Sequence, residues 1–298
     1  MPNKRARERQ LAKLAARRQT ERYQAKRRRS RTVAIVVVAA AAGLVIVGRQ
    51  LIGGNGSTTP SSSPSASASP KPGTQTGTVQ PGTAAETVAC GGTKPAAAGE
   101  PKPQFNSPKN VVPEGAKVTV TLVTSCGDIV LELDPARAPA TVNSFVFLTK
   151  QDYFDGTFFH RLDTSIDVIQ GGDPEGSGGG GPGYSIPDEL KGNETYGPGT
   201  IAMANAGAGT GGSQFFIITG PNGHNLDGNP NYTIFGQVIE GLDVAKHIQG
   251  IPIKDPDAAA AGDLAGQAPT QAIYIEDVKV QVTKPPSPSP SASPTPTG

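Results

Sequence analysis

Three amide side chains stand beside apolar residues in the middle of the sequence, and this pairing is the first sign of a functional site. Gln170 and Asn205 each follow a short apolar run, and Gln214 lies two residues before Phe216. A buried amide is costly unless it is hydrogen-bonded, so a purely structural core does not favour amides at these positions. Together with Arg161, they indicate a groove that binds peptide main chain beside an apolar pocket.

Four short motifs stand in the same region, and Phe235-Gly236 follows them. They are Phe159-His160-Arg161, Gln170-Gly171-Gly172-Asp173, Met203-Ala204-Asn205-Ala206-Gly207 and Gly212-Ser213-Gln214-Phe215-Phe216. Several motifs in the right order are far more specific than a single short one. These motifs resemble those of the cyclophilins, which are peptidyl-prolyl cis-trans isomerases, and the resemblance covers residues 117–282.

The implied reaction is rotation about the bond that precedes a proline. Its barrier of about 18–20 kcal/mol comes from the partial double bond between carbon and nitrogen. No nucleophile, metal or cofactor is needed, because the enzyme has only to stabilise the twisted state more than the planar one. The resemblance therefore implies no cofactor, no metal and proline-containing polypeptides as partners. The two cysteines and three scattered histidines also form no metal-ligand pattern.

The resemblance implies that Arg161 is the catalytic residue, because it matches the Arg of the family's Phe-His-Arg motif. A cation that donates to the prolyl nitrogen weakens the amide resonance. The alternative is a structural arginine that pairs with Asp155, Asp163 or Asp167.

Ten further residues are expected to bind the substrate, as the family's motifs imply. Phe216 would form the floor of a proline pocket, and the alternative for it is ordinary core packing. Gly176 would lie near the groove, with simple turn geometry as its alternative. The ten are Phe216, Gln170, Gln214, Asn205, Ala204, Val168, Leu226, Tyr232, Ile166 and Gly176.

The loop between Arg161 and Gln170 departs from the family pattern by one extra residue. The family's pocket Phe falls on Ile166 counted forward or on Asp167 counted back, and we expect Ile166 to turn inward. Val168 stands where the family usually has Met.

The far side of the expected pocket also departs from the pattern. Asn225 replaces the family's Trp directly before Leu226, and the chain has no Trp. Tyr232 stands where the family has a His, after a two-residue insertion. The pocket is therefore less aromatic, and we expect only weak binding of the family's inhibitor cyclosporin.

Around these motifs the sequence predicts many short strands and two helices. Alternating apolar and polar residues predict an antiparallel pair over 118–125 and 128–134, and a helix capped by Thr141 is expected over 138–151. A second helix is expected over 243–250. Further strands are expected over 158–162, 167–172, 199–205, 213–219, 232–239 and 273–282.

These elements predict one mainly β domain over residues 117–283. The family's fold is a closed eight-stranded antiparallel barrel capped by two helices, which this pattern allows. Residues 53–88 are rich in Ser, Pro and Gly and predict a disordered linker, and 89–116 form a Pro-rich lead-in. Residues 284–298 predict a disordered Pro/Ser tail.

Charge is distributed unevenly along the chain. Residues 1–31 contain 13 Lys and Arg against Glu8 and Glu21, a net charge of +11, whereas residues 53–298 carry −10. The apolar stretch 32–52 reaches the ~20 residues that a membrane-spanning helix needs. We therefore expect a bacterial, membrane-anchored protein with a cytoplasmic N-terminus, an extracytoplasmic domain and anionic lipid contact at the basic tail.

Two alternatives remain for the N-terminal part. The apolar stretch could belong to a cleaved signal peptide, although its basic region is long and no clear cleavage site follows. The basic tail could bind nucleic acid, a weaker interpretation because a membrane candidate follows it directly.

Both cysteines, Cys90 and Cys126, lie after the apolar stretch. In an extracytoplasmic domain they can form a disulfide that ties the lead-in to the first strand. Two free thiols, or a disulfide to another chain, are the alternatives.

The expected function is isomerisation of X-Pro bonds that accelerates the folding of exported proteins, with the chain as a monomer. The alternative is a non-catalytic proline-peptide binding module or holdase. The motif residues favour the enzyme, whereas the loss of the Phe and Trp positions favours the binding module.

Overall fold

A computed structural model describes residues 72–80 and 82–284 of the chain. The expected basic tail at 1–31 and membrane helix at 32–52 lie outside these residues, as does the C-terminal tail from residue 285. Within the described ranges, no helix is both long and apolar enough to cross a membrane.

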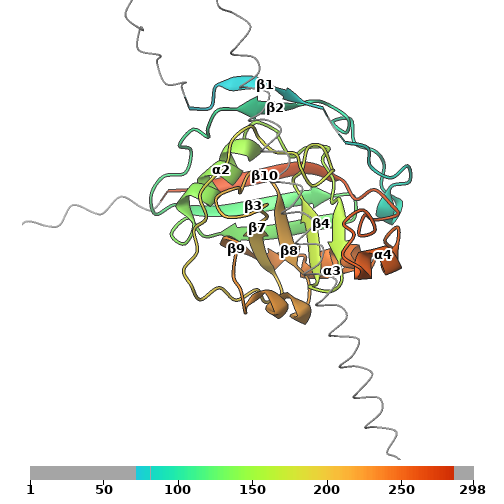
Figure 1. Cartoon of the computed structure of the whole chain (residues 1–298). Helices are drawn as coiled ribbons and strands as arrows, with labels where there is room; N and C mark the ends of the chain where they lie inside the picture. The colour runs from blue at the N-terminus through green and yellow to red at the C-terminus, as the bar shows by residue number, and fades with distance from the viewer. Residues whose placement is uncertain (1–71, 81, 285–298) are drawn as a thin grey trace, which may run out of the picture. The chain divides into compact units, whose positions relative to one another are not determined.

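The fold is built around one sheet of eight antiparallel strands (Figure 1). The strands lie in the order β10-β3-β4-β9-β7-β8-β6-β5, so β8 lies between β7 and β6. Their bounds are β3 (Lys117–Thr124), β4 (Gly127–Leu133), β5 (Arg161–Asp163), β6 (Val168–Gly171), β7 (Thr200–Met203), β8 (Phe215–Ile218), β9 (Ile234–Glu240) and β10 (Ile275–Thr283).

The expected closed barrel is found only in part, because β5 and β10 do not form a ladder with each other. Instead, the residues that precede the two strands meet. An isolated antiparallel bridge joins Phe158 to Tyr274, and the Phe159 N–H donates to the Ile273 carbonyl at 2.9 Å.

Side-chain alternation explains the outer strands. On β3, Val118, Val120 and Leu122 are fully buried, while the threonines between them are half-buried. The short strands β6, β7 and β8 are buried at every position, which is typical of strands covered on both faces.

Both expected helices are present as α2 (Pro139–Thr149) and α3 (Leu242–Gln249). The expected cap was wrong: Ala138 occupies the N-cap position of α2, and Thr141 lies inside the helix. The Glu189 carboxylate accepts hydrogen bonds from the Ala140 and Thr141 N–H groups at 2.9 and 2.8 Å. A distant carboxylate thus satisfies the exposed donors and complements the helix dipole.

Three short helical turns were not predicted. They are the 3-10 helices η1 (Ala89–Gly91) and η2 (Pro221–Leu226), and the α-helix α4 (Pro256–Ala260). Each is only three to six residues long, which is too short for a helical period of apolar residues to be recognised in the sequence.

A second, two-stranded sheet lies in the segments expected to be linker and lead-in. Strand β1 (Gln75–Val79) pairs antiparallel with β2 (Lys102–Phe105), so the part of the linker that the structure describes does contain a strand. Phe105 is buried, and its ring packs edge-on against Phe147 of α2 at 5.0 Å. This apolar anchor attaches the two-stranded sheet to the core, which composition alone did not indicate.

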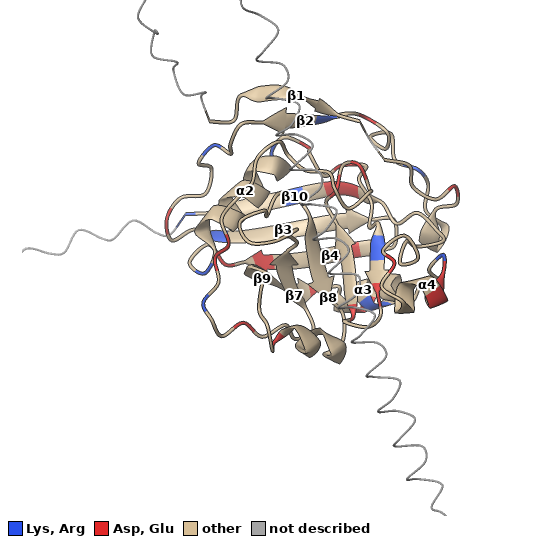
Figure 2. Ribbon diagram, viewed as in Figure 1, with Lys and Arg blue, Asp and Glu red and all other residues tan. Residues whose placement is uncertain are grey.

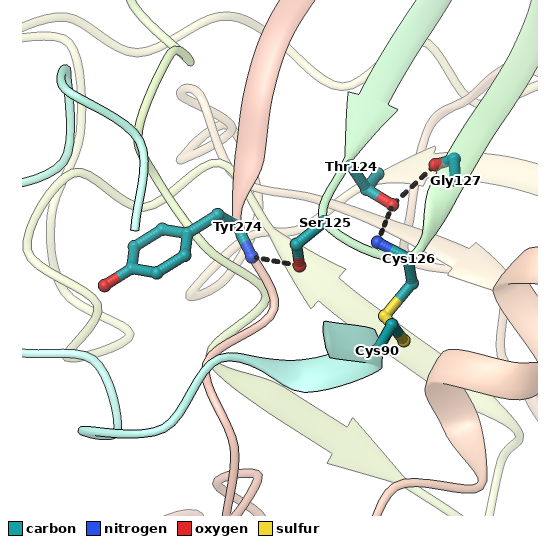
Figure 3. The surroundings of a disulfide bond; sticks show 6 residues. All are labelled: Cys90, Thr124, Ser125, Cys126, Gly127 and Tyr274. Carbon is teal, nitrogen blue, oxygen red and sulfur yellow. Dashed lines mark hydrogen bonds between the residues drawn. A yellow bond between two sulfur atoms is a disulfide. The ribbon is translucent and has the colours of Figure 1, made fainter. Parts of the chain in front are cut away.

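The expected disulfide between Cys90 and Cys126 is present (Figure 3). Cys126 lies in the turn between β3 and β4, where the Thr124 hydroxyl accepts a hydrogen bond from the Cys126 N–H and donates one to the Gly127 carbonyl. Ser125 beside it accepts a hydrogen bond from the Tyr274 N–H. The disulfide therefore ties the lead-in to a turn that is itself fixed.

Candidate active site

One cavity of about 1030 Å³ brings together all eleven residues that the sequence predicts for the site. They come from β5, β6, β8 and η2 and from the loops that flank these elements. The eleven are Arg161, Ile166, Val168, Gln170, Gly176, Ala204, Asn205, Gln214, Phe216, Leu226 and Tyr232.

Three hydrogen bonds hold the guanidinium of Arg161 in place. Nε donates to Gln267 Oε1 at 2.5 Å, Nη1 to Gln170 Oε1 at 2.9 Å and Nη2 to Asp163 Oδ2 at 2.6 Å. A guanidinium has five N–H groups, so two remain for a ligand. The side chain is 22% exposed, so an arginine fixed by an ion pair is still open to the cavity.

Sequence reasoning missed Gln267, which is 106 residues from Arg161 along the chain. Its amide also donates to Asp163 Oδ2 at 3.3 Å, so it binds both members of the ion pair. Gln267 stands in an Ala- and Gly-rich loop without periodicity, and no local signal marks it.

Two glutamine amides extend the hydrogen-bonded chain away from Arg161. Gln170 Nε2 donates to Gln214 Oε1 at 3.0 Å, and Gln214 Nε2 donates to the Gly180 carbonyl at 3.0 Å. Because Arg161 can only donate, it sets the orientation of the Gln170 amide, and that amide sets the orientation of Gln214.

The side chain of Asn205 shapes its own loop. Its Nδ2 donates to the Asn231 carbonyl at 2.7 Å, and its Oδ1 accepts from the Gly207 N–H at 3.2 Å. Ala204 beside it donates its N–H to the Gln214 carbonyl at 2.9 Å. These bonds engage the side-chain amide of Asn205, so its backbone is the better candidate for holding a peptide.

Apolar side chains form a small cluster at the cavity, separate from the main core. Phe216 is 4% exposed and packs with Val168, Ile166, Leu226 and Tyr232. The rings of Phe216 and Tyr232 are perpendicular, with centroids 5.2 Å apart.

Phe215 and Phe216 take opposite faces of β8, as strand geometry requires. The ring of Phe215 belongs to the main core and lies 5.5 Å from the ring of Phe145. Phe216 is thus the member of the pair that lines the cavity.

The structure decides between Ile166 and Asp167. Ile166 lines the cavity, as expected. Asp167 adopts a positive φ of 49°, and its carboxylate accepts hydrogen bonds from the main-chain and side-chain N–H groups of Asn222 at the start of η2. Asn225, in the position of the family's Trp, instead donates to the Ser165 carbonyl at 3.2 Å.

Gly176 lines the cavity and is also required by the local backbone. Its φ is +63°, and a Cβ at this position would lie 2.2 Å from Phe158 Cζ. Only glycine fits such a site without strain, so turn geometry requires glycine here, and its contact with a substrate stays a prediction.

His160, directly before Arg161, is 8% exposed, and neither ring nitrogen forms a hydrogen bond with the described part of the chain. Burial lowers the pKa of His160, the Asp173 carboxylate partly opposes this shift, and the Arg161 guanidinium adds to it. The ring is therefore held neutral beside the arginine.

The lowered pKa of His160 predicts a pH-dependent stability. The unfolded chain binds a proton near the ordinary pKa of about 6.5, whereas the folded chain does not until a lower pH, so the free energy of unfolding falls as pH drops below about 6.5. His160→Gln removes this contribution of up to about 1.4 kcal/mol per pH unit. Urea denaturation at pH 7, 6 and 5 measures both slopes, and equal slopes would contradict the prediction.

Comparison with known proteins gives one family for this domain. The family model described as "Cyclophilin type peptidyl-prolyl cis-trans isomerase/CLD" matches residues 119–280. Peptidyl-prolyl cis-trans isomerase CYP18-2 of Arabidopsis thaliana is 40% identical over 149 residues, which are 49% of this chain and 88% of that protein. Peptidyl-prolyl cis-trans isomerase B of Bacillus subtilis is 46% identical over 121 residues, or 40% and 82%.

A longer relative matches over less of its own length. Probable peptidyl-prolyl cis-trans isomerase B of Mycobacterium tuberculosis (strain H37Rv) is 44% identical over 142 residues, which are 43% of this chain and 45% of that protein. The similarity to that relative therefore concerns under half of each chain.

Proposed function

Because the chain belongs to the cyclophilin-type peptidyl-prolyl cis-trans isomerase family, we propose that the cavity around Arg161 is its isomerase site. The enzyme class is that of a cofactor-independent isomerase of X-Pro bonds. One observation carries the assignment of the site. The Arg161 guanidinium is held by three hydrogen bonds, keeps two N–H groups for a ligand, and shares one cavity with the apolar side chains around Phe216.

Arg161 acts on the nitrogen of the prolyl bond. In the planar amide the nitrogen lone pair is delocalised and a poor acceptor. As the bond twists, the lone pair localises and accepts a hydrogen bond from the guanidinium. This bond forms in the twisted state and not in the ground state, which is the condition for lowering a barrier.

The remaining residues of the cavity hold the two sides of the bond. The proline ring packs on Phe216, with Val168, Ile166 and Leu226 around it and the Tyr232 ring at its edge. Gln170, Gln214 and the backbone of Asn205 hold the peptide main chain, and Ala204 leaves room for it to pass. With the ring fixed, the acyl side is free to rotate.

A protease-coupled assay on a proline-containing tetrapeptide tests the function directly. We expect the full-length chain in detergent to accelerate the cis-to-trans step. A folded chain that binds the peptide without acceleration would favour the non-catalytic binding module instead. The sequence identity of 40–46% with proteins named as isomerases supports the catalytic interpretation.

The same proposal places the domain outside the cytoplasmic membrane, where it acts on exported proteins. Support comes from the apolar stretch 32–52, from the net charge of +11 before it, and from the disulfide between Cys90 and Cys126. The basic tail then lies against anionic lipid, and the chain acts as a monomer.

The charge pattern of the described part fits this arrangement. In the view of Figure 2, Lys and Arg are spread over separate loops and strands, and Asp and Glu lie between them. The concentration of positive charge is therefore a property of residues 1–31, beside the apolar stretch.

Protease treatment of spheroplasts tests the topology. The full-length chain carries one tag before Met1 and another after Gly298, and is expressed in a bacterial host. We expect protease to remove the C-terminal tag and domain and to spare the N-terminal tag. The reverse pattern would contradict the topology, and a secreted chain shortened by the mass of residues 1–52 would indicate a cleaved signal peptide.

A further inference from the structure

One residue of the cavity wall comes from outside the region that the family model matches. Gln104 lies on β2, before residue 119, whereas the other lining residues lie between His160 and Ala268. The two-stranded sheet of β1 and β2 therefore contributes to the site, although it precedes the domain predicted from the sequence.

Strand β2 lies very close to the Gly-rich loop that forms one wall of the cavity. The Phe105 N–H donates to the Pro182 carbonyl at 2.8 Å. A Cβ at Gly183, whose φ is +89°, would lie 2.9 Å from the Phe105 carbonyl oxygen and 3.1 Å from Gln104 Cβ. Glycine at 183 thus permits β2 to approach the cavity.

The same N-terminal segment holds the other end of this loop. The Gly82 N–H donates to the Pro174 carbonyl at 3.1 Å, and a Cβ at Gly82 would lie only 1.5 Å from the Glu175 carbonyl oxygen. Between these two contacts, the disulfide from Cys90 ties the segment to the barrel. The loop from residue 174 to 183 is therefore fixed at both ends.

A continuous line of polar groups leads from the catalytic arginine to this wall. It runs from Arg161 through Gln170 and Gln214 to the Gly180 carbonyl. An extended peptide advances about 3.3–3.6 Å per residue. A substrate with its proline on Phe216 that follows this line brings a residue two or three positions away to the Gly-rich loop and Gln104.

The amide of Gln104 makes no hydrogen bond with the described part of the chain, and the residue is half-buried. We propose that Gln104, which comes from outside the region matched by the family model, contacts the substrate residue two or three positions from the proline and so adds to the subsite beside the Gly-rich loop 176–183. The uncommitted amide both donates and accepts, so it suits peptide main chain or an uncharged polar side chain. The subsite rests on the proposed isomerase site.

A charge-swap experiment tests the subsite without relying on loss of function. Full-length Gln104→Glu and Gln104→Lys are assayed in detergent, at fixed ionic strength, on a peptide series with Lys or Glu at each position up to three residues from the proline. For each position we compare kcat/KM of the Lys peptide with kcat/KM of the Glu peptide. At one position, two or three residues from the proline, we expect this Lys-to-Glu ratio to rise about two- to fivefold in Gln104→Glu. It should fall by a similar factor in Gln104→Lys.

Gln281→Glu and Gln281→Lys provide the matched control. Gln281 is an exposed glutamine on β10 that does not line the cavity, and its substitution changes the net charge equally. We expect no position-specific change in the ratio from these variants.

The outcomes separate the subsite from the isomerase site. If the two Gln104 variants show the same charge preference at every position, or the Gln281 variants change it equally, the subsite is overturned while the isomerase stands. If the wild-type chain accelerates no peptide in the series, the isomerase site itself is overturned, and the subsite with it.

Discussion

Replacement of Arg161 by alanine is expected to reduce kcat/KM for a proline tetrapeptide by about 10²–10³-fold, or roughly 3–4 kcal/mol of transition-state stabilisation. The guanidinium is the cation of the cavity that three hydrogen bonds fix in place. Its bond to the prolyl nitrogen strengthens only as the amide twists, so the loss should fall mainly on kcat and less on KM. The protease-coupled assay measures both constants.

Arg161→Lys tests whether charge alone is enough. Lysine retains the positive charge but cannot donate in a fixed plane to Gln267, Gln170 and Asp163 at once. We expect most of the activity to be lost in this variant also.

Arg137→Ala provides the control for loss of an ion-paired arginine. Arg137 forms an ion pair with Glu194 at 3.3 Å, its side chain is 27% exposed, and it does not line the cavity. Its kcat/KM should stay within about twofold of wild type, because the lost side chain does not reach the cavity in which the substrate binds. If Arg161→Ala, folded by near-ultraviolet circular dichroism, kept more than a third of wild-type activity, Arg161 would be a structural residue.

Replacement of Phe145 by alanine is expected to cost about 3–5 kcal/mol of the free energy of unfolding. The side chain on α2 is 1% exposed, and its ring lies 4.8 Å from Phe154, 5.5 Å from Phe215 and 5.5 Å from Phe235. Removing it leaves a cavity at the point where the helix, a loop and two strands meet. Close packing around this point prevents the neighbours from filling the space fully.

Urea denaturation of the oxidised protein measures the change, and the melting temperature should fall by about 10 °C or more. Ile239→Ala on β9 is the control, because Ile239 is 50% exposed, and its loss should cost no more than about 0.5 kcal/mol. A cost below about 1.5 kcal/mol for Phe145→Ala would show that the core around α2 collapses into the space.

Most of the site could be predicted from the sequence, because its residues belong to motifs with fixed local geometry. Gln170 lies on β6 and Phe216 on β8, and these strands pair so that Gln170 stands opposite Phe216. Arg161 on β5 stands opposite Gln170 in the same way. Strand pairing alone therefore brings the three residues together, and the order of the motifs predicts the strands.

The contacts between segments that are far apart in the sequence could not be predicted. Gln267 beside Arg161, Glu189 at the start of α2 and Gln104 in the cavity wall each lie in segments without periodic pattern. Composition also predicted disorder where β1 forms, because β1 pairs with β2, and the residue that anchors this pair, Phe105, lies on β2 outside the linker.

Side-chain periodicity and motif order are local properties of the chain, so they predicted the strands of the eight-stranded sheet, the two main helices and eleven of the residues that line the cavity. Which carboxylate pairs with Arg161 followed only from the folded structure. Asp163 does so because residues two apart on a strand share one face, as on β5. Asp167 lies in the longer loop, where a positive φ turns its carboxylate to η2 instead.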